Sequence, residues 1–299
     1  MSPAQEIRRP GYLIFRENGT FDSKVMTLLM STEVITELDE ITKIVEKVRP
    51  LISASQIAQR NLLALQNFEK EGAKPTPFSV LPSGRMIETS LIYKMDASRH
   101  ISNFLSSFRS FLDHYSAHLS ERFGNHSKEV ERFKAETRKH YDSKFGYRFV
   151  YRFRNYAQHY SIPISDINVS YLMDHNIQNY ALSSRLTLVR NELVRWREWG
   201  PLRNEILGLP EKIDIVPLIK EAGNSLNEIC IEVLRIDAND LLRCQDYLER
   251  VCSILKLEPG AIPVVWIGEN AGEGLPPAKM DILPVDEMRL IVRSMGAPV

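Results

Sequence analysis

Apolar residues recur at helical spacing over most of the chain. From Ser23 to Glu71 they follow one another at three- or four-residue steps, as in Leu28, Leu29, Ile35, Leu38, Ile41, Val45 and Val48. Pro50 should kink or break this run, so a second helix is expected to follow it and to end at Gly72. A long helix is predicted over Ser90–Phe123, with Gly124 at its end.

The second half of the chain mixes helix with a short β-segment. A charged helix is expected over His126–Phe145, before Gly146. Residues 164–195 alternate apolar and polar positions in places, which predicts a small β-hairpin. Helical spacing returns over Leu218–Lys256, with a break expected at Asn239-Asp240. The predicted class is mainly α, an antiparallel helical bundle with a small β-hairpin insertion.

Three segments are expected along the chain. Residues 1–22 predict an irregular N-terminal arm with a short strand at Tyr12–Phe15. Residues 23–256 form the predicted helical bundle domain, with the hairpin inside it. Residues 257–299 contain six prolines and five glycines, so an irregular C-terminal arm with one strand around Val264–Ile267 is expected.

Composition and charge exclude several classes of protein. The 299 residues are 43% hydrophobic and carry no net charge, with 38 Lys and Arg against 38 Asp and Glu, which is typical of globular proteins. A disordered chain, a collagen-like fibre and a disulfide scaffold are excluded. Three cysteines without a C-x-x-C pair suit a reducing compartment. No signal peptide or membrane-length apolar run is present, so a soluble cytoplasmic protein without a membrane partner is expected.

The segment Tyr147–Tyr160 has the most informative pattern, and it predicts a short helix. At about 100° per residue, five aromatic positions form one stripe that should face the core. They are Phe145, Phe149, Phe153, Tyr156 and Tyr160. A second, polar stripe runs beside it and consists of Arg148, Arg152, Asn155 and His159. Arg154 lies about 140° around the helix from His159.

These polar residues suit chemistry on a phosphodiester. An arginine is a permanent, forked cation for the anionic oxygens of a transition state. A neutral histidine can take a proton from an attacking hydroxyl, such as the 2′-OH of RNA, so neither a metal nor another cofactor is expected. Between Lys128 and Arg154, nine Lys and Arg stand against four Asp and Glu, a local charge of +5 that fits a nucleic-acid backbone.

The stretch Arg154-Asn-Tyr-Ala-Gln-His159 resembles the R-x4–6-H motif of the HEPN superfamily, over roughly residues 90–165. HEPN proteins are helical bundles, and many are metal-independent endoribonucleases of toxin–antitoxin, phage-defence and related systems. The resemblance implies Arg154 and His159 as the catalytic pair and Asn155 as their polar support. It also implies a homodimer in which two motifs share one cleft, RNA as the substrate, and a partner such as an antitoxin. The long bundle and the hairpin depart from a minimal HEPN domain.

The hypothesis for function is therefore an RNA-binding hydrolase in which His159 is the general acid or base. Arg154 would stabilise the developing charge, and Arg148, Arg152 and Gln158 would bind the substrate. The alternative is a non-catalytic helical module that binds RNA, a nucleotide or a protein partner through the same basic surface.

Other motifs leave further alternatives open. Arg109 and His114 repeat the R-x4-H spacing inside the long helix. His114 and His118 lie at i and i+4, the spacing of a metal pair, which would suit a metal-dependent hydrolase. Trp196 and Trp199 could stack on bases, although packing is the commoner role. The glycine-rich residues 268–274 lack Gly-Lys-Ser/Thr, so they predict a turn and not a phosphate loop.

Overall fold

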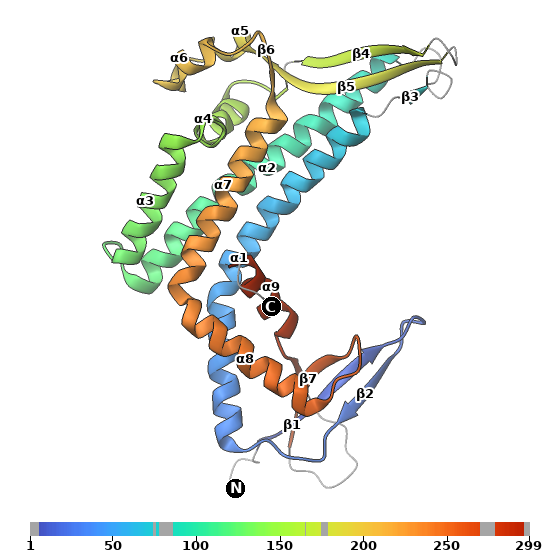
Figure 1. The fold of residues 1–299 in the computed structure, drawn as a ribbon, viewed down its shortest axis with the longest axis vertical. Coiled ribbons are helices and arrows are strands. Elements are labelled where there is room, and N and C mark those ends of the chain that lie inside the picture. Colours follow the sequence, from blue (N-terminus) through green and yellow to red (C-terminus); the bar gives the residue numbers. More distant parts are fainter. Residues whose placement is uncertain are drawn as a thin grey trace. The chain divides into compact units, whose positions relative to one another are not determined.

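The computed structural model describes residues 6–73, 76–77, 86–164, 166–174, 179–269 and 279–295. The chain is mainly helical and forms two compact units (Figure 1). One unit consists of residues 51–233, and the other combines residues 1–50 with 234–299. This division does not follow the three predicted segments, because the two ends of the chain belong to the same unit.

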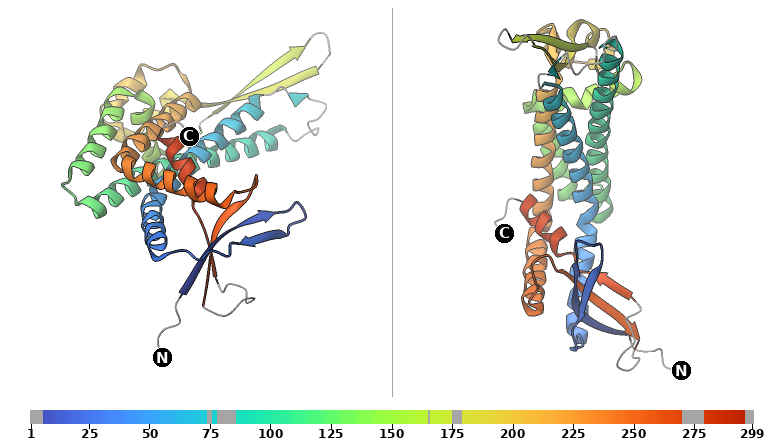
Figure 2. Two further views of the ribbon diagram at one scale, coloured as in Figure 1. Left: turned by 60° about the horizontal axis from the view of Figure 1, so that its bottom comes forward. Right: turned by 90° about the vertical axis from the view of Figure 1, so that its right-hand side faces the viewer.

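The unit of residues 51–233 holds most of the helices. It contains residues 51–73 of α1 (Thr32–Ala73), α2 (Met86–Phe123), α3 (Lys128–Ser143), α4 (Phe145–His159), α5 (Arg190–Leu193), the 3-10 helix η2 (Arg197–Trp199), α6 (Leu202–Leu207) and nearly all of α7 (Ile215–Leu234). The long helices α1, α2 and α7 lie side by side in this unit (Figure 2). Its core is rich in fully buried aromatic side chains, among them Phe104, Phe108, Phe111, Tyr115, Phe149 and Phe153.

Hydrogen bonds give the direction of the first two helices. The Tyr115 hydroxyl of α2 donates to the carbonyl of Leu51 at 3.0 Å, and Asn61 of α1 donates to Ser107 Oγ of α2 at 3.1 Å. The numbering on α2 falls as that on α1 rises, so the two helices are antiparallel. Gly124, at φ +89°, follows α2 as expected, because a left-handed residue ends a helix at little cost when it has no side chain.

The predicted hairpin is confirmed. Strands β4 (Asp166–Asp174) and β5 (Asn179–Val189) pair antiparallel, with Asp166 opposite Thr187 and Asp174 opposite Asn179. Two shorter strands, β3 (Thr76–Pro77) and β6 (Lys212–Asp214), also pair with β5.

The strands predicted at Tyr12–Phe15 and Val264–Ile267 are confirmed as parts of longer strands, but the prediction that the two arms are otherwise irregular is wrong. They form one antiparallel sheet with the order β2-β1-β7-β8. Its strands are β1 (Glu6–Phe15), β2 (Phe21–Val25), β7 (Ile262–Glu269) and β8 (Lys279–Ile282). The pairing of β1 with β7 joins residues more than 240 positions apart, and it supplies the backbone partners that the local sequence does not show. The helices η3 (Arg235–Asp237), α8 (Ala238–Leu255) and α9 (Val285–Ser294) complete this unit.

The positions of the two expected helix breaks also need correction. Pro50 lies inside the 42-residue helix α1 and does not break it. A proline costs the helix a hydrogen bond, but the flanking apolar residues Val48, Leu51 and Ile52 are all buried, which favours the helix on both sides. The break in the last long helical run is η3, which lies before Asn239-Asp240.

Gly146 allows a close approach between α4 and α7. Lys144 is extended and separates α3 from α4 by a single residue. The Gly146 N–H then donates to the carboxylate of Glu221 on α7. A Cβ at Gly146 would lie 2.6 Å from both the Leu218 carbonyl oxygen and Glu221 Oε2, closer than van der Waals contact allows.

We therefore expect Gly146→Ala to lower the free energy of unfolding by about 1–3 kcal/mol, because the backbone carbonyl of Leu218 cannot move aside. Chemical denaturation followed by circular dichroism measures this change. Gly208→Ala is the matched control, since its new Cβ would come no closer than 3.4 Å to another atom. Equal stability of the two variants would contradict the packing argument.

Candidate functional site

The aromatic stripe of α4 fixes how this helix sits. Phe149, Phe153 and Tyr156 are buried, whereas Tyr160 is 51% exposed, so the prediction that Tyr160 faces the core is wrong. Phe149 and Tyr156 each stack on Phe153 and on Trp199. Trp196 meets Tyr156 edge-on, with ring centroids 5.8 Å apart. Both tryptophans are buried, so the hypothesis that they stack on bases is wrong. Their place is in the core that anchors α4.

The two motif residues at the start of the R-x4-H stretch contact each other. Arg154 and Asn155 are half-buried, and Arg154 Nη1 donates to Asn155 Oδ1 at 3.2 Å. Arg154 Nε is buried and has no hydrogen-bond partner among the residues that the structure describes. A buried guanidinium N–H of this kind retains the capacity to bind an acceptor.

His159 lies in a different environment, at the exposed end of α4. It lines a groove of about 810 Å³ together with Gln158, the following residues 160–163, and α2. The α2 side of the groove contributes Leu91, Lys94, Met95, Ser98, Arg99 and Ser102. Within the part of the chain that is described, Arg154 and Asn155 do not line this groove. The structure thus brings His159 together with the cations of α2, and not with Arg154.

The other two predicted substrate-binding arginines differ in their availability. The guanidinium of Arg148 forms an ion pair with Glu205, and it also donates to the carbonyl of Tyr141 at 3.1 Å. The hydrogen bond to Glu205 raises the pKa of Arg148. Arg148 therefore ties α4 to α3 and α6, and is already engaged. Arg152 is half-buried, and its Nε has no partner among the described residues.

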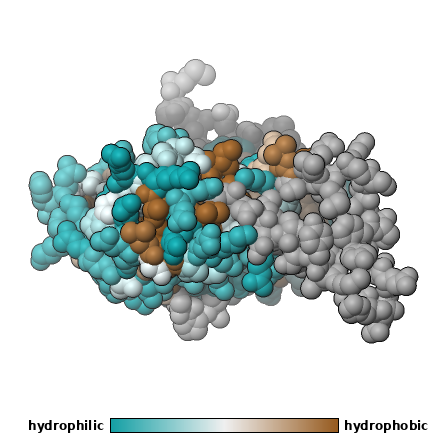
Figure 3. Space-filling model, turned by 90° about the horizontal axis from the view of Figure 1, so that it is seen from above, coloured by the Kyte–Doolittle hydropathy of each residue, from teal (hydrophilic) through white to brown (hydrophobic). Residues whose placement is uncertain are grey.

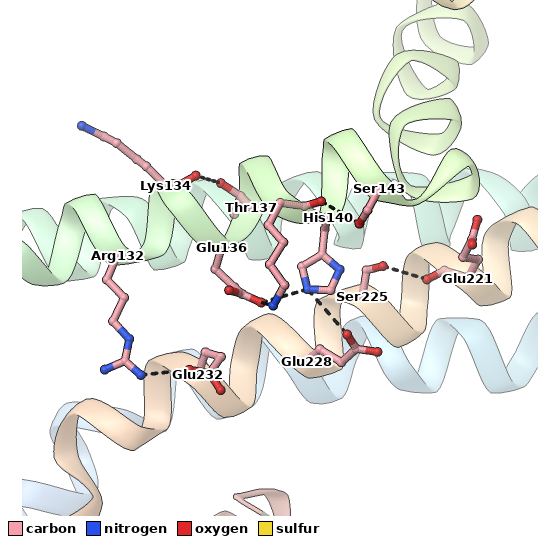
Figure 4. Close-up of polar contacts among 11 residues, drawn as sticks. Arg132, Lys134, Glu136, Thr137, His140, Ser143, Glu221, Ser225, Glu228 and Glu232 are labelled. Atoms are coloured by element: carbon pink, nitrogen blue, oxygen red, sulfur yellow. Dashed lines mark hydrogen bonds and ion pairs between the residues drawn. The ribbon is translucent and has the colours of Figure 1, made fainter. Parts of the chain in front are cut away.

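A polar cluster between α3 and α7 reduces the basic character of this region (Figure 4). Arg132 pairs with Glu232 at 2.9 Å. The buried His140 presents Nε2 to Glu136 at 3.2 Å and to Glu228 at 3.7 Å. Lys134 and Lys139 also pair with glutamates of α3. Several of the nine cations counted in sequence are thus neutralised, partly by carboxylates of α7 that lie far away in the chain.

The second R-x4-H motif is a bridge between helices. Arg109 pairs with Asp113 at 2.8 Å and donates to the Tyr151 hydroxyl of α4 at 3.1 Å. His114 is exposed and His118 is half-buried. No group of three or more His, Cys, Asp or Glu within the described ranges could hold a metal ion. Most of residues 268–274 lie outside the described residues.

His100 follows the groove residue Arg99 in the chain, and the charge of Arg99 affects its pKa. Its Nε2 lies 3.4 Å from Arg99 Nη2, and its ring lies 5.0 Å from the ring of Phe68. Burial and then the charge of Arg99 lower the pKa of His100 below 6.5, against an opposing effect of Asp96. The cation of Arg99 therefore acts on its surroundings although it lies 3.3 Å from Asp96.

Comparison with models of known families, with curated proteins and with solved structures finds no match for this chain. In the described parts of the chain, no helix is both long enough and apolar enough to cross a membrane.

We expect Arg99→Gln to raise the pKa of His100 toward 6.5, because one of the two causes of its lowering is removed while burial remains. NMR titration of the histidine ring protons measures the shift. Arg109→Gln is the control, since Arg109 is absent from the causes of the shift. An unchanged titration in Arg99→Gln would show that the charge of Arg99 does not reach the ring.

Proposed function

We propose that this protein is a metal-independent endoribonuclease of the HEPN type, with His159 as its general acid or base. The observation that carries the proposal is the position of His159, exposed in a groove of about 810 Å³ with Lys94 and Arg99 of α2. A histidine beside cations in an open groove combines proton transfer with binding of an anionic backbone.

The reaction needs no group beyond RNA and the side chains. The 2′-oxygen attacks the neighbouring phosphorus while His159 takes the hydroxyl proton. The bond from phosphorus to the 5′-oxygen then breaks, and the leaving oxygen receives a proton, which gives a 2′,3′-cyclic phosphate and a 5′-hydroxyl. Arginine stabilises the charge that develops on the phosphoryl oxygens.

A homodimer completes the proposed site. Arg154 lies about 140° around α4 from His159, so one copy directs the two motif residues to different sides. A two-fold arrangement would bring Arg154 of one copy to His159 of the other, as isologous interfaces do. Asn155, bound to Arg154, would orient that guanidinium. The resemblance adds to this proposal a cytoplasmic role as a toxin or in phage defence, with an antitoxin or another defence partner.

One observation favours a second candidate, a non-catalytic helical module that binds RNA, a nucleotide or a protein partner. Among the described residues, the groove is lined by His159 but not by Arg154, so one copy does not bring the two motif residues together. Such a module would bind with an affinity that falls with salt, and it would leave RNA intact with or without EDTA.

We expect His159→Ala to reduce cleavage of RNA by about 100-fold or more, the usual contribution of a general acid or base. The wild-type activity should persist in EDTA. Gel electrophoresis of a labelled, unstructured RNA measures both effects.

His114→Ala is the matched control, because His114 belongs to the second R-x4-H motif, is also exposed, and does not line the groove in the described residues. Circular dichroism checks that both variants fold. Full cleavage by folded His159→Ala, or equal losses in the two variants, would remove His159 from the proposed role.

A further inference from the structure

The groove beside His159 has a second property, a set of exposed apolar side chains on both of its walls. Leu91 and Met95 are 58% and 63% exposed on α2, one helical turn apart. Ile162 and Tyr160, on the segment after α4, are 63% and 51% exposed. All four line the same groove. Hydrophobic residues also reach the surface among hydrophilic ones on the end of this unit that is seen from above (Figure 3).

Cations accompany these apolar residues. Lys94 lies between Leu91 and Met95 in sequence, and Arg99 lies four residues after Met95. Both line the groove, and the side chain of Arg99 is 58% exposed. Its contact with Asp96 spans one helical turn at 3.3 Å, an exposed pair of the kind that contributes little stability and can yield to a phosphate.

This combination selects one class of ligand. Exposed apolar and aromatic side chains offer contact to the faces of bases, and neighbouring cations match the charge of the backbone. In a duplex the base faces are stacked on one another and are not available to side chains. A single strand exposes both its bases and its phosphates, so it can use both kinds of residue at once.

We infer that the groove binds single-stranded RNA, with bases on Leu91, Met95, Tyr160 and Ile162 and with phosphates on Lys94 and Arg99. This inference rests on the proposed function, because it gives the substrate class of the same site. None of these six residues belongs to the R-x4-H motif, so their contribution can be tested apart from cleavage.

Binding is measured in full-length His159→Ala, so that the RNA stays intact. The probe is a fluorescent 12-nucleotide oligouridylate followed by fluorescence anisotropy, compared with a duplex of the same length. In this background Met95→Glu should weaken binding of the single strand by about 5- to 100-fold, because it removes an apolar contact and adds a negative charge that repels the phosphates. Met95→Leu, which keeps the apolar surface, should bind like the parent.

Two further variants separate the apolar contribution from the ionic one. Arg99→Gln should weaken binding and lower the slope of log affinity against log salt by about 0.7. Ile254→Glu places the same new charge on α8, in the other unit, where Ile254 is 70% exposed, and it should leave binding unchanged.

The outcomes distinguish this inference from the proposed function. If wild-type protein cleaves no RNA but binding follows the expected pattern, the inference stands and the nuclease proposal fails. If wild-type protein cleaves RNA while Met95→Glu and Arg99→Gln neither weaken binding nor lower kcat/KM, the inference fails and the nuclease proposal stands. Equal affinity for the duplex, or binding to phosphatidylserine vesicles in place of RNA, also overturns the inference.

Discussion

The burial of one aromatic stripe determines what α4 shows to solvent. Phe149 and Tyr156 stack against Trp199, with Phe153 stacked on both of them, and these contacts set the rotation of the helix about its axis. Each of these side chains is nearly or fully removed from water, so each contributes on the order of 2–3 kcal/mol of hydrophobic stabilisation. A different rotation would expose these rings and bury arginines in their place. The exposure of His159 at the end of α4 follows from this packing.

Polar contacts then decide which cations stay available. Arg148 of α4 forms an ion pair with Glu205 of α6. Arg132 of α3 forms an ion pair with Glu232 of α7. Gly146 permits this proximity, since its backbone N–H reaches the Glu221 carboxylate of α7. The same packing that holds the helices together therefore lowers the positive charge around the motif. Lys94 and Arg99 of α2 are the cations that line the groove with His159.

Local patterns predicted the elements whose partners lie nearby in the chain. The helices α2 to α4 and the hairpin of β4 and β5 follow from periodicity and from Gly124. The expected break at Gly146 was wrong, because α3 ends at Ser143 and Gly146 lies inside α4. The sheet of the other unit could not be predicted in this way. Its pairs β1–β2 and β7–β8 are local, but the pairing of β1 with β7 joins segments from opposite ends of the chain. Pro50 does not break α1 for a related reason, since the burial of Val48 and Leu51 is a tertiary effect that outweighs local propensity.

The candidate site shows the same limit at the scale of single side chains. Spacing on one helix places His159 and Arg154 on different sides, and it also identifies Arg148 as a polar residue of the exposed stripe. The spacing of residues on α4 does not show that Glu205 forms an ion pair with Arg148, or that Arg99 lines the groove with His159. A functional surface built from two helices depends on how they pack, and α2 and α4 are separate in sequence. The motif therefore locates the histidine, whereas the neighbouring helix supplies the charge and the apolar surface that give the groove its selectivity.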